Sequence, residues 1–212
     1  MQFEDLEKLL SNKRLENYYL KFPNSKEKAL EFYQLNTQIA ESLYPLLSNF
    51  EVVLRNSINY SFIIHFKSTT WYENLNYPEL TSQINEAKAK IHKKNNQITS
   101  DRIVSELTLG FWTSLFNKKY AKDLWKPLMY IFPYVDKQTN QRNIISNKLN
   151  NIRKFRNRIF HFEPICNDLQ LLKNNHYQIL ELLDGINKDV LVWTKQIDRF
   201  DELFIKAKIF NP

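Results

Sequence analysis

Glycine is nearly missing from this chain, whose 212 residues include only Gly110 and Gly185. β-Hairpins and the turns of α/β folds usually need glycine where the backbone adopts a positive φ angle. The scarcity therefore argues against a sheet-based fold and favours helices joined by few tight turns.

Cysteine is represented by Cys166 alone. A single thiol excludes an internal disulfide bond and any metal site built from several cysteines, which suits a reducing cytoplasm. Residues 1–20 mix acidic and basic side chains, unlike a secretory signal. No apolar run approaches the roughly 20 residues that span a bilayer. We therefore expect a cytoplasmic protein without metal, cofactor or membrane attachment.

Acidic residues are missing from residues 137–162, although the whole chain has 23 of them. The same stretch holds as many cations as the net charge of +7, namely Lys137, Arg142, Lys148, Arg153, Lys154, Arg156 and Arg158. A localised cationic stretch is typical of proteins that bind a polyanion such as RNA. The alternative, an ordinary solvated basic face, is equally compatible with charge alone.

The apolar residues that are present recur at helical spacing along most of the chain. We predict an all-α fold of one domain, with Ser25 and residues 99–101 as helix caps. Pro45 should kink or break one long helix near Leu43, which we treat as two segments, and Pro127 and Pro133 should divide the region before residue 140. The expected helices cover residues 4–20, 26–66 in two segments, 78–95, 102–116, 140–162 and 168–199.

The helix expected at residues 143–162 combines two faces. An apolar seam is formed at steps of three or four by Ile145, Leu149, Ile152, Phe155, Ile159 and Phe162. Arg153, Asn157 and His161 form a polar stripe beside it. Arg156 projects onto the seam, where an unpaired guanidinium is costly, so it needs a partner. Glu51, Glu106 or a phosphate from a ligand would serve.

His161 should lie at the C-terminal end of this helix, because Pro164 disfavours helical geometry at Glu163. The helix dipole there favours the protonated imidazole ring. A histidine beside arginines suits phosphoryl chemistry, with the ring moving a proton and arginine stabilising negative charge. The plainer interpretation is a capping histidine on a basic surface.

Other residues give weaker signals. His65, His92 and His176 are isolated in sequence, so surface or core positions are expected for them rather than metal binding. Cys166 follows His161 closely, but a nucleophilic pair would lack an orienting third group. The larger aromatic residues are expected in the core more than in base stacking: Trp71, Tyr72, Trp112 and Trp125.

Three blocks of the sequence resemble the Abi-like (abortive infection) family. The last is Arg-Asn-Arg-Ile-Phe-His at residues 156–161, which matches the Arg-x-x-x-x-His signature of HEPN domains. The others are Phe-Glu-Val-Val-Leu-Arg-Asn at 50–56 and Leu-Thr-Leu-Gly-Phe-Trp at 107–112. The resemblance spans residues 25–205, and three blocks in the family's order are more specific than the short signature alone.

This resemblance implies a HEPN-like helical domain with long antiparallel helices at residues 25–212, preceded by an N-terminal helical extension at 1–24. It also implies a homodimer in which two motifs meet at a cleft. The implied activity is metal-independent RNA cleavage in anti-phage defence, as in a toxin restrained by an RNA or protein antitoxin. The alternative is a non-catalytic RNA-binding protein that acts with a structured RNA or protein partner, and a third is a protein-interaction module.

The resemblance assigns catalytic roles to three residues. His161 would be the acid and base, Arg156 would bind the phosphate, and Asn157 would orient the ring or contact the substrate. The expected RNA-binding residues are Arg153, Lys154, Arg158 and Arg55. Glu51 would lie in the same cleft as Arg55, although their spacing of four favours an ordinary ion pair within one helix.

Overall fold

The chain is all-α in a computed structural model that describes residues 3–210, where no β-strand occurs. None of the helices in this range is long and apolar enough to cross a bilayer. The α-helices are α1 (Phe3–Leu10), α2 (Asn12–Lys21), α3 (Lys26–Phe66), α4 (Pro78–Lys93), α5 (Ser100–Glu106), α6 (Leu109–Ser114), α7 (Ala121–Met129), α8 (Arg142–Phe160), α9 (Leu169–Ile186), α10 (Lys188–Lys195) and α11 (Phe200–Phe210). The 3₁₀ turns are η1 (Trp71–Asn74), η2 (Lys118–Tyr120) and η3 (Ile165–Asn167).

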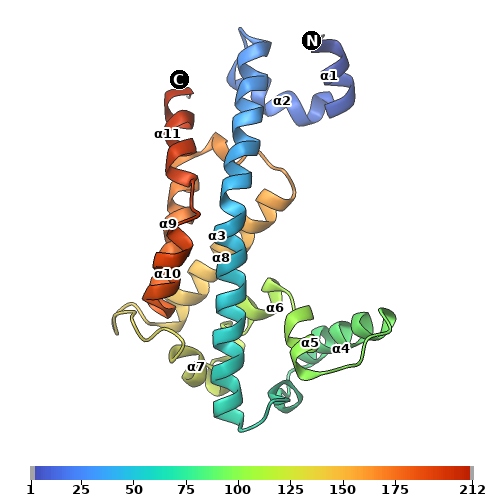
Figure 1. The fold of residues 1–212 in the computed structure, drawn as a ribbon, viewed down its shortest axis with the longest axis vertical. Helices are drawn as coiled ribbons and strands as arrows, with labels where there is room; N and C mark the ends of the chain where they lie inside the picture. The colour runs from blue at the N-terminus through green and yellow to red at the C-terminus, as the bar shows by residue number, and fades with distance from the viewer. Residues whose placement is uncertain (1–2, 211–212) are drawn as a thin grey trace.

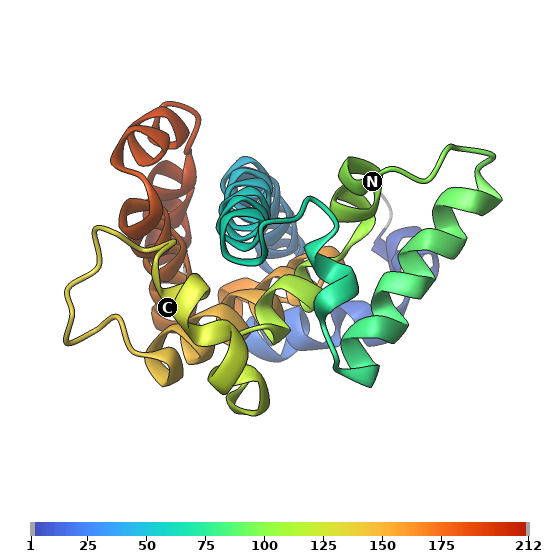
Figure 2. The same cartoon turned by 90° about the horizontal axis from the view of Figure 1, so that it is seen from below.

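Helix α3 is the axis of the molecule (Figure 1). It is 41 residues long and packs against α2, α6, α7, α9 and α11. Seen end-on in Figure 2, it has α9 to α11 on one side and α4 with α5 on the other. Side chains buried along its whole length, from Ala29 to Phe62, tie these layers into one core.

The predicted break at Pro45 is wrong, because α3 continues through the proline. Proline removes one N–H bond and usually kinks a helix. Here Leu43, Leu46 and Leu47 on either side are almost fully buried. Tertiary packing of these leucines holds both halves of α3 in line, since helices in proteins are stabilised mainly by their packed face.

Three helices predicted as continuous are in fact divided, each at a residue whose side chain caps the following segment. Ser11 separates α1 from α2 with a φ of 70° and accepts a hydrogen bond from the N–H of Arg14. Thr108 separates α5 from α6, and Asn187 separates α9 from α10. Such side chains offer the backbone an alternative partner and so interrupt a helix that periodicity alone would extend.

The N-terminal helices pack onto the start of α3. Leu15 and Tyr18 of α2 are buried, and the Tyr18 ring meets Phe32 edge-on with centroids 6.2 Å apart. The predicted cap at Ser25 is confirmed by its hydrogen bond from the N–H of Lys28. The division between an extension at 1–24 and a domain at 25–212 stays a prediction.

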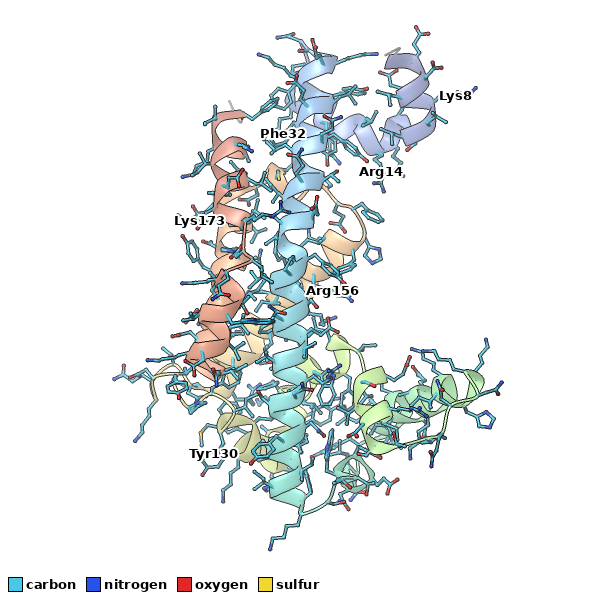
Figure 3. All side chains as sticks on the ribbon, viewed as in Figure 1. Lys8, Arg14, Phe32, Tyr130, Arg156 and Lys173 are labelled. Carbon is cyan, nitrogen blue, oxygen red and sulfur yellow. The ribbon has the colours of Figure 1, made fainter. Side chains whose placement is uncertain are left out.

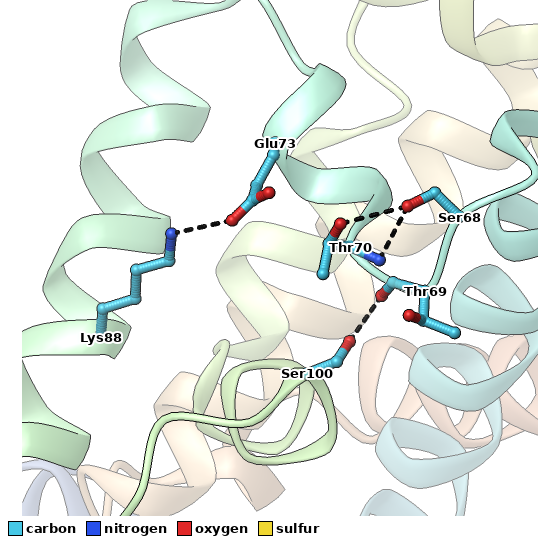
Figure 4. Close-up of polar contacts among 6 residues, drawn as sticks. All are labelled: Ser68, Thr69, Thr70, Glu73, Lys88 and Ser100. Carbon is cyan, nitrogen blue, oxygen red and sulfur yellow. Dashed lines mark hydrogen bonds and ion pairs between the residues drawn. The ribbon is translucent and has the colours of Figure 1, made fainter.

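The segment after α3 contains η1 and is held by polar contacts between side chains and backbone (Figure 4). Ser68 and Thr70 share a hydrogen bond between their hydroxyls, and Ser100 at the start of α5 donates to the Thr69 carbonyl. Lys88 of α4 reaches Glu73 of η1 at 3.4 Å. These contacts hold helices α4 and α5 against the segment that follows α3.

Gly185 permits the loop after α7 to cross closely over α9. A Cβ at this position would lie 2.4 Å from Cγ2 of Val135. We expect the Gly185→Ala variant to lose about 1–3 kcal/mol to this clash, partly offset by about 1 kcal/mol of helix propensity. In a Val135→Ala background the clash disappears and the propensity remains. Urea unfolding should therefore show that Gly185→Ala destabilises the wild-type protein but is neutral or stabilising in the Val135→Ala protein. A change of the same sign in both proteins would contradict this explanation.

Candidate functional site

Helix α8 is anchored by its apolar seam. Ile145, Leu149, Ile152, Phe155 and Ile159 are all buried, as predicted. Phe162 was expected on the same seam, and this is wrong, because its side chain is 69% exposed. The reason is that the helix ends at Phe160 and the backbone turns before residue 162.

The C-terminal end of α8 is closed by a Schellman motif, which places His161 at the C-cap. The N–H of Phe162 donates to the Ile159 carbonyl at 3.0 Å, and the N–H of Glu163 donates to the Arg158 carbonyl at 2.9 Å. Phe162 adopts the left-handed conformation, with a φ of 57°. This pattern satisfies carbonyl groups that a helix end otherwise leaves open. The prediction that His161 lies at the C-terminal end of the helix is therefore confirmed, with Phe160 rather than His161 or Phe162 as the last helical residue.

An ion pair and a buried amide hold this turn in place. Arg158 Nε lies 2.9 Å from Glu163 Oε2, so the pair spans the two ends of the motif. Asn36 of α3 is buried; its amide Nδ2 donates to the Glu163 carbonyl and its Oδ1 accepts from the N–H of Cys166. One side chain of the central helix thus fixes the chain that follows His161.

Arg156 of α8 faces α3, on which Glu51 lies; Figure 3 labels it beside α3. Its guanidinium carbon lies 4.3 Å from the centroid of the Phe160 ring, and that ring lies 6.1 Å from the ring of Tyr44. Its Nε lies 4.0 Å from Glu51 Oε2. Of the two predicted carboxylate partners, Glu51 is the one observed, because Glu106 pairs with Lys94 instead.

The pairing of Arg156 with Glu51 is loose. A separation of 4.0 Å is too long for a hydrogen bond, and Arg156 Nε is buried without a hydrogen-bond partner. Both side chains are about one-third exposed, so solvent screens their attraction. Phe160 and Glu51 therefore orient the guanidinium. Its Nε is out of reach of a ligand, but the side chain is one-third exposed, so its terminal N–H groups can still donate to an anion such as a phosphate.

Asn157 and His161 lie one turn apart at the end of α8, Asn157 half-buried and His161 exposed. The N–H of His161 donates to the backbone carbonyl of Asn157 at 2.9 Å. Over residues 3–210, no hydrogen bond joins the side chains of Arg156, Asn157 and His161 to one another. A step of five residues turns about 140° around a helix, so Arg156 and His161 leave α8 on different sides.

The remaining predicted RNA-binding residues differ in their exposure and in their contacts with other side chains. Lys154 is exposed, Arg153 is half-buried and within 3.5 Å of Asn150 Oδ1, and Arg158 pairs with Glu163. Arg55 donates to its neighbour Asn56 at 3.1 Å. The favoured ion pair between Glu51 and Arg55 is wrong, because Glu51 turns to Arg156.

Cys166 is fully buried beside this site. Burial raises the pKa of its thiol to about 12. The thiol is therefore protonated at neutral pH, which agrees with the prediction that Cys166 and His161 do not form a nucleophilic pair.

His176 lies in the core, one of the two positions expected for it, and there it forms a buried pair with Asp198, with Nε2 and Oδ2 2.7 Å apart. Burial raises the pKa of Asp198, but hydrogen bonds from His176 and the N–H of Phe200 outweigh it, and the pKa is lowered overall. The two residues are 22 apart, so no local spacing could reveal the pair. No group of three or more His, Cys, Asp or Glu within residues 3–210 is arranged to hold a metal ion.

The three sequence blocks come together in the structure. Phe50 and Leu54 of the first block, Phe111 and Trp112 of the second, and Phe155 and Ile159 of the third are all buried. Helix α6, which carries most of the second block, packs against both α3 and α8. Trp71 and Trp112 are buried core residues, as predicted, and the Trp112 indole donates to the Leu107 carbonyl.

Comparison with protein-family models, with curated proteins and with solved structures returns no match to this chain.

The amide of Asn36 should be essential to the turn after His161. We expect Asn36→Leu to lower the free energy of unfolding by about 1–3 kcal/mol, because it leaves the buried Glu163 carbonyl and Cys166 N–H without partners. Amide exchange at Cys166 should accelerate with it. Gln34→Leu, at an exposed position of the same helix, is the matched control. Equal urea midpoints for the two variants would refute this role.

Proposed function

We propose that this chain is an RNA-cutting protein of the Abi-like family with a HEPN-type active site, which acts in anti-phage defence in the bacterial cytoplasm. The observation that carries the proposal is the arrangement at the end of α8. Arg156 is oriented but under-paired, His161 is exposed at the C-cap, and the helix bearing both has no acidic residue. Such a surface fits a phosphodiester better than a neutral or cationic substrate.

The proposed reaction breaks one phosphodiester bond without a metal ion. The 2′-hydroxyl of a ribose attacks the adjacent phosphorus, a new 2′-oxygen–phosphorus bond forms, and the bond to the 5′-oxygen breaks. The products are a cyclic 2′,3′-phosphate and a 5′-hydroxyl. Imidazole at His161 takes or returns the proton, and Arg156 neutralises the charge that develops on the phosphoryl oxygens.

The proposed roles of the neighbouring residues follow from their positions. Asn157 stands one turn before His161 and would orient its ring or contact the ribose. Arg153, Lys154, Arg158 and Arg55 would bind phosphates along the strand. Because Arg156 and His161 leave α8 on different sides, we propose that a homodimer assembles the complete site. An RNA or protein antitoxin would restrain it in uninfected cells.

A second candidate function is RNA binding without catalysis, with a structured RNA or a protein as partner. The observation that favours it is that Arg156 and His161 leave α8 on different sides within one chain. Phosphate binding by Arg153, Lys154 and Arg158 of α8 does not require a homodimer to bring those two residues together. The two functions differ in one respect: binding without catalysis does not depend on the imidazole of His161.

RNA affinity should depend steeply on salt, because several cations share one face of α8. For three or more phosphate contacts, binding of a single-stranded RNA should weaken at least about tenfold between 50 and 200 mM salt. Lys154→Ala should lower the slope of log affinity against log salt by about 0.7, and Lys93→Ala on α4 should leave it unchanged. Fluorescence anisotropy measures both slopes. An affinity independent of salt would remove α8 as the RNA-binding face.

Cleavage should depend on the imidazole of His161. We expect wild-type protein to cut single-stranded RNA in the presence of EDTA, and His161→Ala to lower the rate by about 10²- to 10⁴-fold with little loss of binding. Arg156→Ala should abolish cleavage and also weaken binding. The C-cap hydrogen bond of residue 161 uses its backbone, so replacing its side chain preserves the turn.

The matched control is His92→Ala, which removes an exposed histidine from α4. It should cut RNA at the wild-type rate. Equal cleavage by wild type and His161→Ala would assign the activity to another site or a contaminant. Salt-dependent binding by both proteins, with cleavage by neither, would favour the non-catalytic function.

A further inference from the structure

Phe162, the residue directly after His161, has an unfavourable backbone conformation and an unfavourable exposed side chain. Its φ of 57° lies in the left-handed region, where a side chain with a Cβ is strained and glycine is preferred. Its large apolar ring is also 69% exposed. Neither feature contributes to the core, and strained, exposed residues of this kind concentrate at functional sites.

The Phe162 ring has a cation–π contact with Arg14. The guanidinium carbon of Arg14, from α2, lies 5.6 Å from its centroid. Figure 3 labels Arg14 on α2, above Arg156, which is labelled lower down beside α3. Arg14 is itself exposed and has no ion pair among residues 3–210. Because Phe162 is 69% exposed, most of its surface is accessible to a ligand in addition to Arg14.

Phe160, on the other side of His161, is already engaged. Arg156 lies over its ring, Tyr44 packs beside it, and it is only 41% exposed. The two aromatic residues that flank His161 therefore differ in role. Phe160 orients the arginine of the site, whereas Phe162 presents its ring outward.

We propose that Phe162 is a nucleobase-stacking residue that holds single-stranded RNA beside His161, with Arg14 of the N-terminal helices supporting the stack. This rests on the proposed action on RNA. A base on the Phe162 ring would lie next to the Arg14 guanidinium, which suits a phosphate beside that base. An exposed ring beside the exposed guanidinium of Arg14 fits this ligand better than an apolar protein surface, which would have to desolvate that charge.

The sharpest test is Phe162→Gly, because it removes the ring and also supplies the residue that the left-handed position prefers. The turn should therefore remain folded, with a urea midpoint no lower than that of wild type. Binding is measured in the His161→Ala background, so that cleavage does not interfere. The probes are a 12-nucleotide single-stranded RNA of mixed sequence and an inorganic polyphosphate of the same charge.

We expect Phe162→Gly to weaken RNA binding about 5- to 150-fold, the range for loss of one stacked base, and to leave polyphosphate binding unchanged. Phe162→Trp should restore RNA binding, and Arg14→Gln should weaken binding of both probes. The matched control is Tyr130→Ala, which removes an equally exposed ring from the far end of the molecule in Figure 3. It should change neither affinity.

Each contrary result has its own meaning. Wild-type RNA affinity in Phe162→Gly would overturn the stacking role while leaving the proposed action on RNA intact. Failure of the parent protein to bind RNA would instead refute the proposed function itself. A change from dimer to monomer in Phe162→Gly, seen by light scattering, would assign the ring to contact with a second copy and also overturn the proposal.

Discussion

The closure of α8 at His161 is the constraint on which the candidate site depends. A Schellman turn, the Arg158–Glu163 ion pair and the buried amide of Asn36 together fix the residues after the helix. The turn forces Phe162 into a left-handed conformation that costs about 1–2 kcal/mol for a residue other than glycine. The same turn leaves the side chain of His161 exposed at the C-terminal end of α8.

Arg156 is a partly buried charge at the edge of the core, and its guanidinium is only loosely paired. Phe160 and Glu51 orient it, but neither satisfies its buried Nε. A fully paired arginine would stabilise the fold and leave little capacity for a ligand, whereas a loosely paired one is ready for a phosphate. The N-terminal helices add Arg14 to the same region, so they contribute to the surface as well as to packing on α3.

The all-α fold, the seam of α8 and its end could be predicted from sequence because each depends on local signals: apolar spacing, glycine scarcity and Pro164. The continuity of α3 through Pro45 could not, because it results from burial of leucines against other helices. The divisions at Ser11, Thr108 and Asn187 had a visible signal, a capping side chain, which apolar periodicity obscured. At the site, the pairing of Arg156 with Glu51 was among the alternatives, whereas the roles of Asn36 and Arg14 depend on contacts between distant segments.

The central claim is that the end of α8 cuts RNA by attack of the 2′-hydroxyl. Mass spectrometry of the products from one defined single-stranded RNA tests it most directly, with wild type and His161→Ala prepared in parallel. The account predicts fragments that end in a cyclic 2′,3′-phosphate and begin with a 5′-hydroxyl, formed by wild type alone. Fragments with a 3′-hydroxyl and a 5′-phosphate, or identical products from both proteins, would contradict it.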